Sequence, residues 1–263
     1  MGKRTAVLGG GVMGSTLMRS VIAAGHPDVI VIEKNPERVK ELVRDYRVTA
    51  GPDLELIDGA DVLILAVKPQ DVPALLPQLA DRVSETTIVV SLAAGVKTTT
   101  LEAGLGHQIP VVRVMPNTPA VVGEGMFGVS PGVHVSAEQL ESVEELLAAG
   151  GKSIVIPEDQ QDALTSVSGS GPAYVFYLAE SMIAAGVAEG LDPDVARQLT
   201  NQTLVGAAKL LAESTETPAE LRRQVTSPKG ATYEATTTFD ESGVAAGLVK
   251  GIRAAAKRSA ELG

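Results

Sequence analysis

The sequence contains no cysteine and no tryptophan, and aromatic residues make up only 3% of its 263 residues. The absence of cysteine excludes disulfide bonds and thiolate chemistry. Because large aromatic side chains are scarce, buried cores must be built from Val, Leu, Ile and Ala, which suits parallel strands covered by helices on both faces. The hydrophobic content of 44% is sufficient for such cores.

Basic residues are also in short supply, with 22 Lys and Arg against 32 Asp and Glu, for a formal net charge of −10. This charge argues against nucleic acid or an anionic membrane as a partner, because phosphate binding draws on a basic surface. An anionic small-molecule substrate must therefore be bound locally, by backbone amides or by a few cations.

Long apolar runs and the motifs of hydrolases are missing as well. No apolar run approaches the roughly 18 residues of a membrane span, and the stretch after Lys3 and Arg4 is interrupted by glycines, unlike a signal peptide. The three histidines are scattered, and there is no metalloprotease motif or serine nucleophile elbow. We therefore expect a cytoplasmic protein without a bound metal ion.

The sequence does contain a glycine fingerprint, which directly follows the strand-like run 5–8 and opens a helical run. In a dinucleotide-binding turn the first glycine permits the sharp bend, the second lets the backbone approach the pyrophosphate, and the third allows the helix to pack on the strand. Free N–H groups at the helix N-terminus then bind the phosphates. The candidate cofactor-binding residues of this turn are Gly9, Gly10, Gly11, Val12, Met13 and Gly14.

A second apolar run, residues 29–32, ends in Glu33, 19 residues after Gly14. A carboxylate there accepts a hydrogen bond from a ribose 2′-hydroxyl and repels a 2′-phosphate, which favours NADH. Lys34 and Arg38 could still attract a phosphate if Glu33 turned away, and Glu33 with Lys34 could also be a solvated loop pair. The pattern therefore predicts NADPH or NADH without deciding between them.

Strand-like and helical runs alternate up to residue 156, which predicts a Rossmann-like, doubly wound parallel sheet over residues 1–156. The helices are expected near 12–24, 36–45, 71–82 and 136–149. The strands are expected at 4–9, 28–33, 47–50, 61–67, 86–92 and 110–114, with weaker ones near 127–130 and 153–156.

Residues 157–263 lack such strand runs and are expected to be all-helical, with helices near 172–190, 193–213, 217–225, 229–240 and 243–262. The first and last of these helices are apolar on nearly every side, and so they require burial on every side. About 105 residues cannot provide that alone. We therefore expect this domain to dimerise.

Three further segments follow predicted strands, and ligands of open parallel sheets bind beyond the carboxyl ends of the strands. Lys68 follows a buried strand and is a cation at the expected cofactor site, unless it belongs to a simple strand-ending loop. The segment around Asn117 is stiffened by prolines and could hold a nicotinamide ribose or carboxamide, or form a turn. The candidates in these segments are Ala66, Val67, Lys68, Pro69, Ala93, Met115, Pro116 and Asn117.

Two hydroxyl-rich segments each precede a predicted helix. Residues 168–172, with Ser170, could form a nest of N–H groups for a carboxylate or serve as a hinge before a well-capped helix. Residues 225–232 form a comparable loop, which alone is typical of a helix cap.

In this order and spacing, the segments resemble pyrroline-5-carboxylate reductase, the enzyme family that completes proline biosynthesis. The resemblance covers essentially the whole chain. The matching segments are the fingerprint and residues 66–69, 91–95, 113–120, 167–174 and 226–232.

The resemblance implies reduction of L-1-pyrroline-5-carboxylate to L-proline by NADPH or NADH, and helical domains that interlock in dimers, which often assemble into decamers. It also implies that a loop from the partner subunit holds the substrate carboxylate on its amides, that Thr232 contacts the ring nitrogen as the catalytic residue, and that the nicotinamide lies near residues 115–117. The implied substrate-binding residues are Ser170, Val225, Ser227, Lys229, Gly230, Ala231 and Thr232.

Lys229 departs from the family, which commonly has glycine there. A positive φ at that position would cost a non-glycine residue on the order of 1 kcal/mol. We expect Gly230 to keep the loop's shape, and Lys229 to point to solvent or toward the substrate.

Two alternatives remain open from the sequence. One is a β-hydroxyacid dehydrogenase or another imine reductase, although the former requires a catalytic lysine on the long central helix and residues 172–190 contain none. The other is a non-catalytic dinucleotide sensor.

Overall fold

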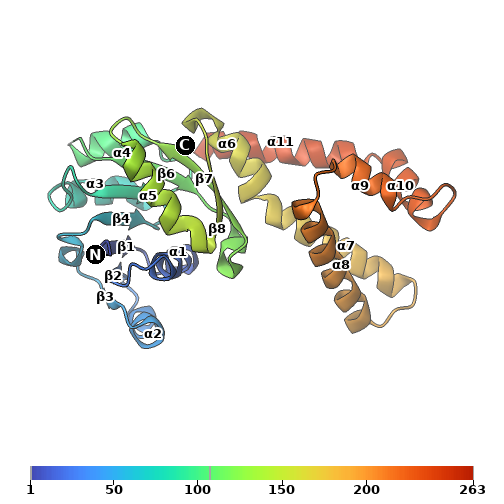
Figure 1. The fold of residues 1–263 in the computed structure, drawn as a ribbon, viewed down its shortest axis with the longest axis horizontal. Helices are drawn as coiled ribbons and strands as arrows, with labels where there is room; N and C mark the ends of the chain where they lie inside the picture. Colours follow the sequence, from blue (N-terminus) through green and yellow to red (C-terminus); the bar gives the residue numbers. More distant parts are fainter. Residues whose placement is uncertain (1, 107, 263) are drawn as a thin grey trace. The chain divides into compact units, whose positions relative to one another are not determined.

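The structure is a computed structural model that describes residues 2–106 and 108–262. The chain forms two compact units, Met1–Ser170 with Ala255–Gly263 and Gly171–Ala254. Figure 1 colours the chain along its sequence, so residues 2–170 run from blue through green towards yellow, the second unit continues from yellow towards red, and the end of the chain, which belongs to the first unit, is red. The sequence placed a domain boundary after residue 156, whereas residues 157–170 pack in the first unit.

The first unit is built on an eight-stranded sheet of order β3-β2-β1-β4-β5-β6-β7-β8. Strand β1 pairs in parallel with both β2 and β4, so that Val7 lies between Val31 and Ile64. All eight predicted strands are confirmed. Their bounds are β1 Thr5–Leu8, β2 Val29–Ile32, β3 Thr49–Gly51, β4 Val62–Leu65, β5 Ile88–Ser91, β6 Val111–Met115, β7 Gly125–Pro131 and β8 Gly151–Val155.

The first six strands are parallel as predicted, but β7 runs antiparallel to β6. The connection between them is a 3₁₀ turn over Thr118–Val122 (η3). This turn is too short for a crossover, since parallel neighbours require a dozen or more connecting residues. Strand β8 then runs parallel to β7, because helix α5 provides the crossover between them.

Helices cover both faces of the sheet, which confirms the doubly wound prediction. Helices α1 (Val12–Ala23), α2 (Pro36–Tyr46) and α5 (Ala137–Leu147) share one apolar core with Val7, Val31 and Ile64. Helices α3 (Val72–Ala80) and α4 (Thr98–Leu105) share the other core with Leu8, Ile32 and Leu65. Alternate residues of each strand therefore point to opposite cores, and the carboxyl ends of the strands remain available for a ligand.

The second unit is helical, and the five helices predicted for residues 172–262 are confirmed. Asp192 and Thr217 accept backbone hydrogen bonds as the N-caps that precede a first-turn proline. The helix bounds are α7 Gly171–Ala188, α8 Pro193–Glu213, α9 Pro218–Gln224, α10 Ala231–Glu241 and α11 Val244–Leu262, the last of which ends in the first unit.

Helix α7 buries none of its residues, although its composition is apolar. Phe176 is 61% exposed and Tyr177 is 71% exposed, and Leu248 on α11 is half exposed. Apolar faces of this extent are typical of protein interfaces. Across residues 2–106 and 108–262, no helix is both long and apolar enough to cross a membrane.

Candidate functional site

The glycine turn has the geometry that a dinucleotide site requires. Gly9 has φ of +107°, and a Cβ there would lie 2.5 Å from the carbonyl oxygen of Ala66. A Cβ on Gly14 would collide with the carbonyl oxygen of Gly9. A Cβ on Gly11 would meet nothing within 4 Å, so this backbone is open to a ligand. Helix α1 begins directly afterwards at Val12 without a side-chain cap, which leaves its first N–H groups available to phosphates.

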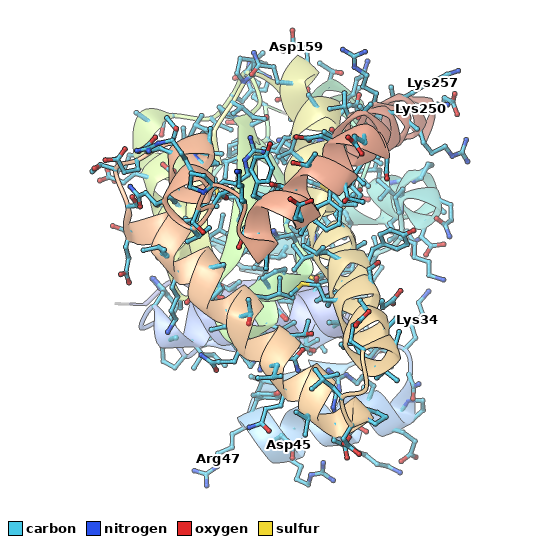
Figure 2. The ribbon with its side chains drawn as sticks, turned by 90° about the vertical axis from the view of Figure 1, so that its right-hand side faces the viewer. Lys34, Asp45, Arg47, Asp159, Lys250 and Lys257 are labelled. Atoms are coloured by element: carbon cyan, nitrogen blue, oxygen red, sulfur yellow. The ribbon has the colours of Figure 1, made fainter. Side chains whose placement is uncertain are left out.

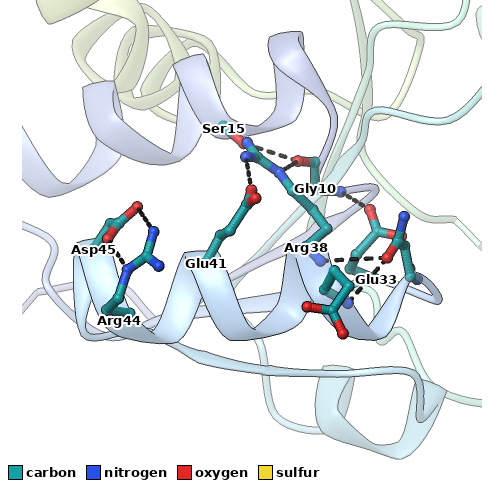
Figure 3. Close-up of polar contacts among 9 residues, drawn as sticks. Gly10, Ser15, Glu33, Arg38, Glu41, Arg44 and Asp45 are labelled. Atoms are coloured by element: carbon teal, nitrogen blue, oxygen red, sulfur yellow. Dashed lines mark hydrogen bonds and ion pairs between the residues drawn. The ribbon is translucent and has the colours of Figure 1, made fainter.

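Glu33 follows β2 and lies beside the glycine turn (Figure 3). Its Oε2 accepts a hydrogen bond from the N–H of Gly10 at 3.0 Å, and its Oε1 accepts one from the N–H of Asn35 at 2.8 Å. The carboxylate is therefore held by the backbone rather than turned away into solvent. Lys34 is exposed, and Figure 2 shows its side chain projecting from the ribbon.

A cleft of about 490 Å³ opens beside the glycine turn. Gly9, Glu33, Lys34 and Val67 contribute to its walls, so the structure brings together candidates from β1, β2 and β4. Its size and its place at the strand ends suit the adenosine half of a dinucleotide. The remaining lining residues are Leu8, Ile32, Pro52, Leu54, Gln70, Asp71, Ala74, Leu75 and Gln78.

The residues that follow β4 and β5 differ in exposure. Lys68 is exposed and its ammonium group has no hydrogen-bond or ion-pair partner among the described residues, so this group is available to a ligand. Ala93, in contrast, is 2% exposed and packs in the core beneath α3 and α4. Its side chain therefore supports the loop, and only its backbone is suited to contact a cofactor.

Met115, Pro116 and Asn117 lie against the π-helical turn over Thr165–Gly169 (η6). The Nδ2 of Asn117 donates to the carbonyl oxygen and the Oγ of Ser168 at 3.2 and 3.3 Å, and its Oδ1 accepts from the N–H of Met126 at 2.9 Å. The Cε of Met115 lies 3.1 Å from where a Cβ on Gly169 would be. The structure thus brings residues 115–117 together with the segment that leads to Ser170, while the Asn117 amide is used to hold that segment.

A buried ion pair supports this end of the sheet and was not identified from the sequence. Arg113 on β6 has a side chain only 6% exposed, and its Nη1 lies 3.4 Å from Oε1 of Glu158. Glu158 also accepts hydrogen bonds from the N–H and the hydroxyl of Thr98, both at 2.8 Å, and so caps helix α4. Thr98 and Glu158 are 60 positions apart in the sequence, so no local pattern indicates this pairing.

The loop over residues 225–232 belongs to the helical unit. Helix α10 begins at Ala231 after the N-cap Gly230, which makes no side-chain cap. The N–H groups of its first turn, at Ala231, Thr232 and Tyr233, have no partner within the helix, an arrangement that favours an anion. Val225, Ser227, Lys229 and Thr232 are all exposed.

The positive φ of this loop is at Lys229 and not at Gly230. Lys229 adopts the left-handed conformation, with φ of +61°, whereas Gly230 has φ of −84°. Glycine is needed at 230 for space, because a Cβ there would lie 2.5 Å from the Oγ of Ser227. The lysine therefore occupies a strained backbone position, and its side chain is exposed as expected.

Ionisable pairs elsewhere in the helices do not add to these candidates. The Arg44 guanidinium holds the pKa of Asp45 below its usual value, and Arg223 does the same to the pKa of Glu220 by donating a hydrogen bond. Both pairs are exposed. The described part of the chain contains no cluster of three or more His, Cys, Asp or Glu able to hold a metal ion.

Curated proteins similar to this chain were found along its whole length. Pyrroline-5-carboxylate reductase of Corynebacterium melassecola is 40% identical over 98% of this chain and 98% of its own length. The chain belongs to the pyrroline-5-carboxylate reductase family. The Pseudomonas aeruginosa member is also 40% identical, over 98% of this chain and 96% of its own. The family model for pyrroline-5-carboxylate reductase dimerisation matches residues 158–262, and that for NADP oxidoreductase, coenzyme F420-dependent, matches residues 4–95.

Solved structures of family members have the same fold. The Coxiella burnetii pyrroline-5-carboxylate reductase has a TM-score of 0.92 at 32% identity and covers 100% of this chain and 99% of its own. The Plasmodium falciparum pyrroline carboxylate reductase, solved with NADP bound, has a TM-score of 0.87 at 26% identity, over 99% of this chain and 98% of its own.

Proposed function

We propose that this protein is an NAD(P)H-dependent pyrroline-5-carboxylate reductase that converts L-1-pyrroline-5-carboxylate to L-proline. The observation that carries the proposal is the fingerprint turn, in which Gly9 and Gly14 leave no room for a Cβ while Gly11 stays open, within a chain 40% identical to a curated reductase over nearly its full length. When bound, the reduced nicotinamide supplies a hydride to the C=N carbon.

The residues of this chain then have to hold the two reactants in place. The first turn of α1 binds the pyrophosphate, and the cleft beside Glu33 holds the adenosine. Lys68, Met115 and Pro116 lie at strand ends suited to the nicotinamide half, and Asn117 positions the neighbouring Ser168. Catalysis by this arrangement comes mainly from alignment of donor and acceptor.

In this proposal the α10 turn binds the substrate. The N–H groups of Ala231 and Thr232 bind its carboxylate, as the anion-binding character of a helix N-terminus favours. The Thr232 hydroxyl hydrogen-bonds the ring nitrogen and orients it. An aliphatic hydroxyl is a poor acid, so Thr232 positions the imine or relays a proton through water rather than supplying the proton itself.

We further propose that the protein works in the cytoplasm as a homodimer built through the helical unit, with the substrate loop coming from the partner subunit. The exposed apolar residues of α7 and α11 and the match to the dimerisation family model support this assembly. Sedimentation of the full chain distinguishes a dimer from a larger assembly such as a decamer.

The decisive experiment is to add L-1-pyrroline-5-carboxylate to the purified protein with NADH or NADPH and to follow oxidation of the nicotinamide together with formation of L-proline. Turnover with proline as the product supports the proposal. A protein that binds the nucleotide without turnover is a sensor, and turnover only with other imines or with β-hydroxyacids identifies a different reductase.

Replacing Lys229 with glycine should stabilise the protein by about 0.5–1 kcal/mol, because glycine adopts a positive φ without the cost that a Cβ imposes. The midpoint of urea unfolding measures this. Lys229→Ala is the matched control, since it removes the ammonium but keeps the Cβ at φ of +61° and should gain nothing. If both variants have an unchanged substrate KM, the ammonium does not attract the substrate. A glycine variant no more stable than the alanine variant would show that the backbone at Lys229 is not strained.

A further inference from the structure

The glycine turn and helix α2 are joined by a closed set of polar contacts among Gly10, Ser15, Glu33 and Arg38 (Figure 3). The N–H of Gly10 donates to Glu33, and the carbonyl oxygen of Gly10 accepts from Arg38 Nε at 2.8 Å and from Ser15 Oγ at 2.9 Å. The N–H group and the carbonyl oxygen of Gly10 therefore fix the glycine turn to the end of β2 and to the start of α2.

Glu33 lines the cleft at the end of β2, where the adenosine ribose lies in dinucleotide-binding folds. Its two backbone hydrogen bonds, from Gly10 and Asn35, hold the carboxylate there before any ligand arrives. An ionised carboxylate accepts about four hydrogen bonds, so it can still accept one from a ribose hydroxyl. It cannot donate one to a phosphate.

Arg38 is the guanidinium nearest to this position along the chain, but three of its five N–H donors are already engaged. Its Nε donates to Gly10, its Nη2 donates to Ser15 Oγ at 2.6 Å, and its Nη1 pairs with Glu41 at 2.8 Å. These charge-assisted bonds hold the guanidinium in place, and moving it to a 2′-phosphate would break them. Lys34, unlike Arg38, lines the cleft, and its ammonium group is an exposed point charge adjacent to Glu33.

We propose that Glu33, fixed by Gly10 and Asn35, makes this enzyme discriminate against the 2′-phosphate and prefer NADH over NADPH. The carboxylate repels the dianionic phosphate, and the bonds of Arg38 to Gly10, Ser15 and Glu41 fix its guanidinium beside the glycine turn. This proposal rests on the proposed function, but it concerns the residues of this chain. The Plasmodium falciparum structure was solved with NADP bound, but this describes that protein and does not decide the preference of this chain.

Fluorescence titration of the full-length protein with NADH and with NADPH tests the preference without any substrate. We expect the Kd of NADH to be lower by roughly 10-fold or more. Thermal shifts with 5′-AMP and 2′,5′-ADP, which differ only in the 2′-phosphate, should show the same order. Equal binding of the two nucleotides, or tighter binding of NADPH, would overturn the proposal whether or not any variant folds.

Glu33→Gln removes the charge and keeps one acceptor oxygen for a backbone N–H group. The ratio of the NADPH Kd to the NADH Kd should fall to within about 3-fold of unity. The matched control is Glu37→Gln, which removes an exposed carboxylate from the first turn of helix α2, where it pairs with Lys40. A ratio that changes equally in both variants would show a general charge effect and contradict a specific role for Glu33.

Lys34→Ala tests whether Lys34 binds the 2′-phosphate of NADPH. If Lys34 were the phosphate receptor, this variant would lose affinity for NADPH selectively by roughly 10-fold, and the proposal would fail. These binding ratios are independent of turnover. Absence of reductase activity with both nucleotides would reject the proposed function. The binding preference would still be decided by the measured Kd values alone.

Discussion

Replacing Gly14 with alanine should weaken cofactor binding strongly and also destabilise the fold. The new methyl group would collide with the carbonyl oxygen of Gly9 and would lie 3.2 Å from the Cβ of Ala66. Backbone cannot yield as a flexible side chain does, so α1 would have to move away from β1. We expect a loss of about 3 kcal/mol in unfolding free energy and a fall in NAD(P)H affinity of roughly 100-fold, because displaced phosphate-binding groups lose their alignment.

Gly11→Ala is the matched control for this prediction. Its methyl group would meet no atom within 4 Å, and its φ of −65° suits any residue. We expect the unfolding free energy to change by less than about 1 kcal/mol, the usual range for alanine at an N-cap. Nucleotide affinity should still fall, since the methyl group faces the approaching pyrophosphate. Chemical denaturation and nucleotide titration separate the two effects, and a Gly14→Ala protein of wild-type stability would contradict the packing argument.

The sequence predicted the sheet well because its strands carry a strong and simple signal. Runs such as Val62–Leu65 are buried on both faces, and four consecutive large aliphatic residues are typical of a central parallel strand. The fingerprint was equally readable, since the space required at Gly9 and Gly14 is a local property of the turn. The predicted cofactor-binding residues that line the cleft come directly after β1, β2 and β4, so predicting these strands also placed them.

Features that depend on distant partners were not predictable in this way. Helix α4 begins with three threonines, which are weak helix formers, and it is capped by Glu158 from far along the chain. The reversal of β7 follows from the connection over Thr118–Val122, and no sequence pattern distinguishes this segment from other loops. Glu33 was predicted to be a ribose ligand, but its bonds to Gly10 and Asn35 could be seen only in three dimensions.

Replacing Thr232 with alanine should lower kcat by roughly 10²-fold or less, the range for loss of one positioned hydrogen bond. The substrate KM should change little, because the carboxylate binds to N–H groups of the α10 turn that alanine retains. The hydroxyl is free to serve this purpose: Thr232 lies in the first turn of α10, and it is the carbonyl of this residue that accepts a bond from Thr236.

Matched variants on the same helix distinguish this role from a structural one. Thr232→Ser keeps the hydroxyl and should restore most of kcat, whereas Thr232→Val keeps the shape without the hydroxyl and should behave as alanine does. Thr238→Ala removes a hydroxyl that bonds to the carbonyl oxygen of Glu234 and should leave kcat unchanged. Complete loss of turnover in a folded alanine variant would show that the hydroxyl carries the proton itself, and unchanged kcat would show that it does not contact the ring nitrogen.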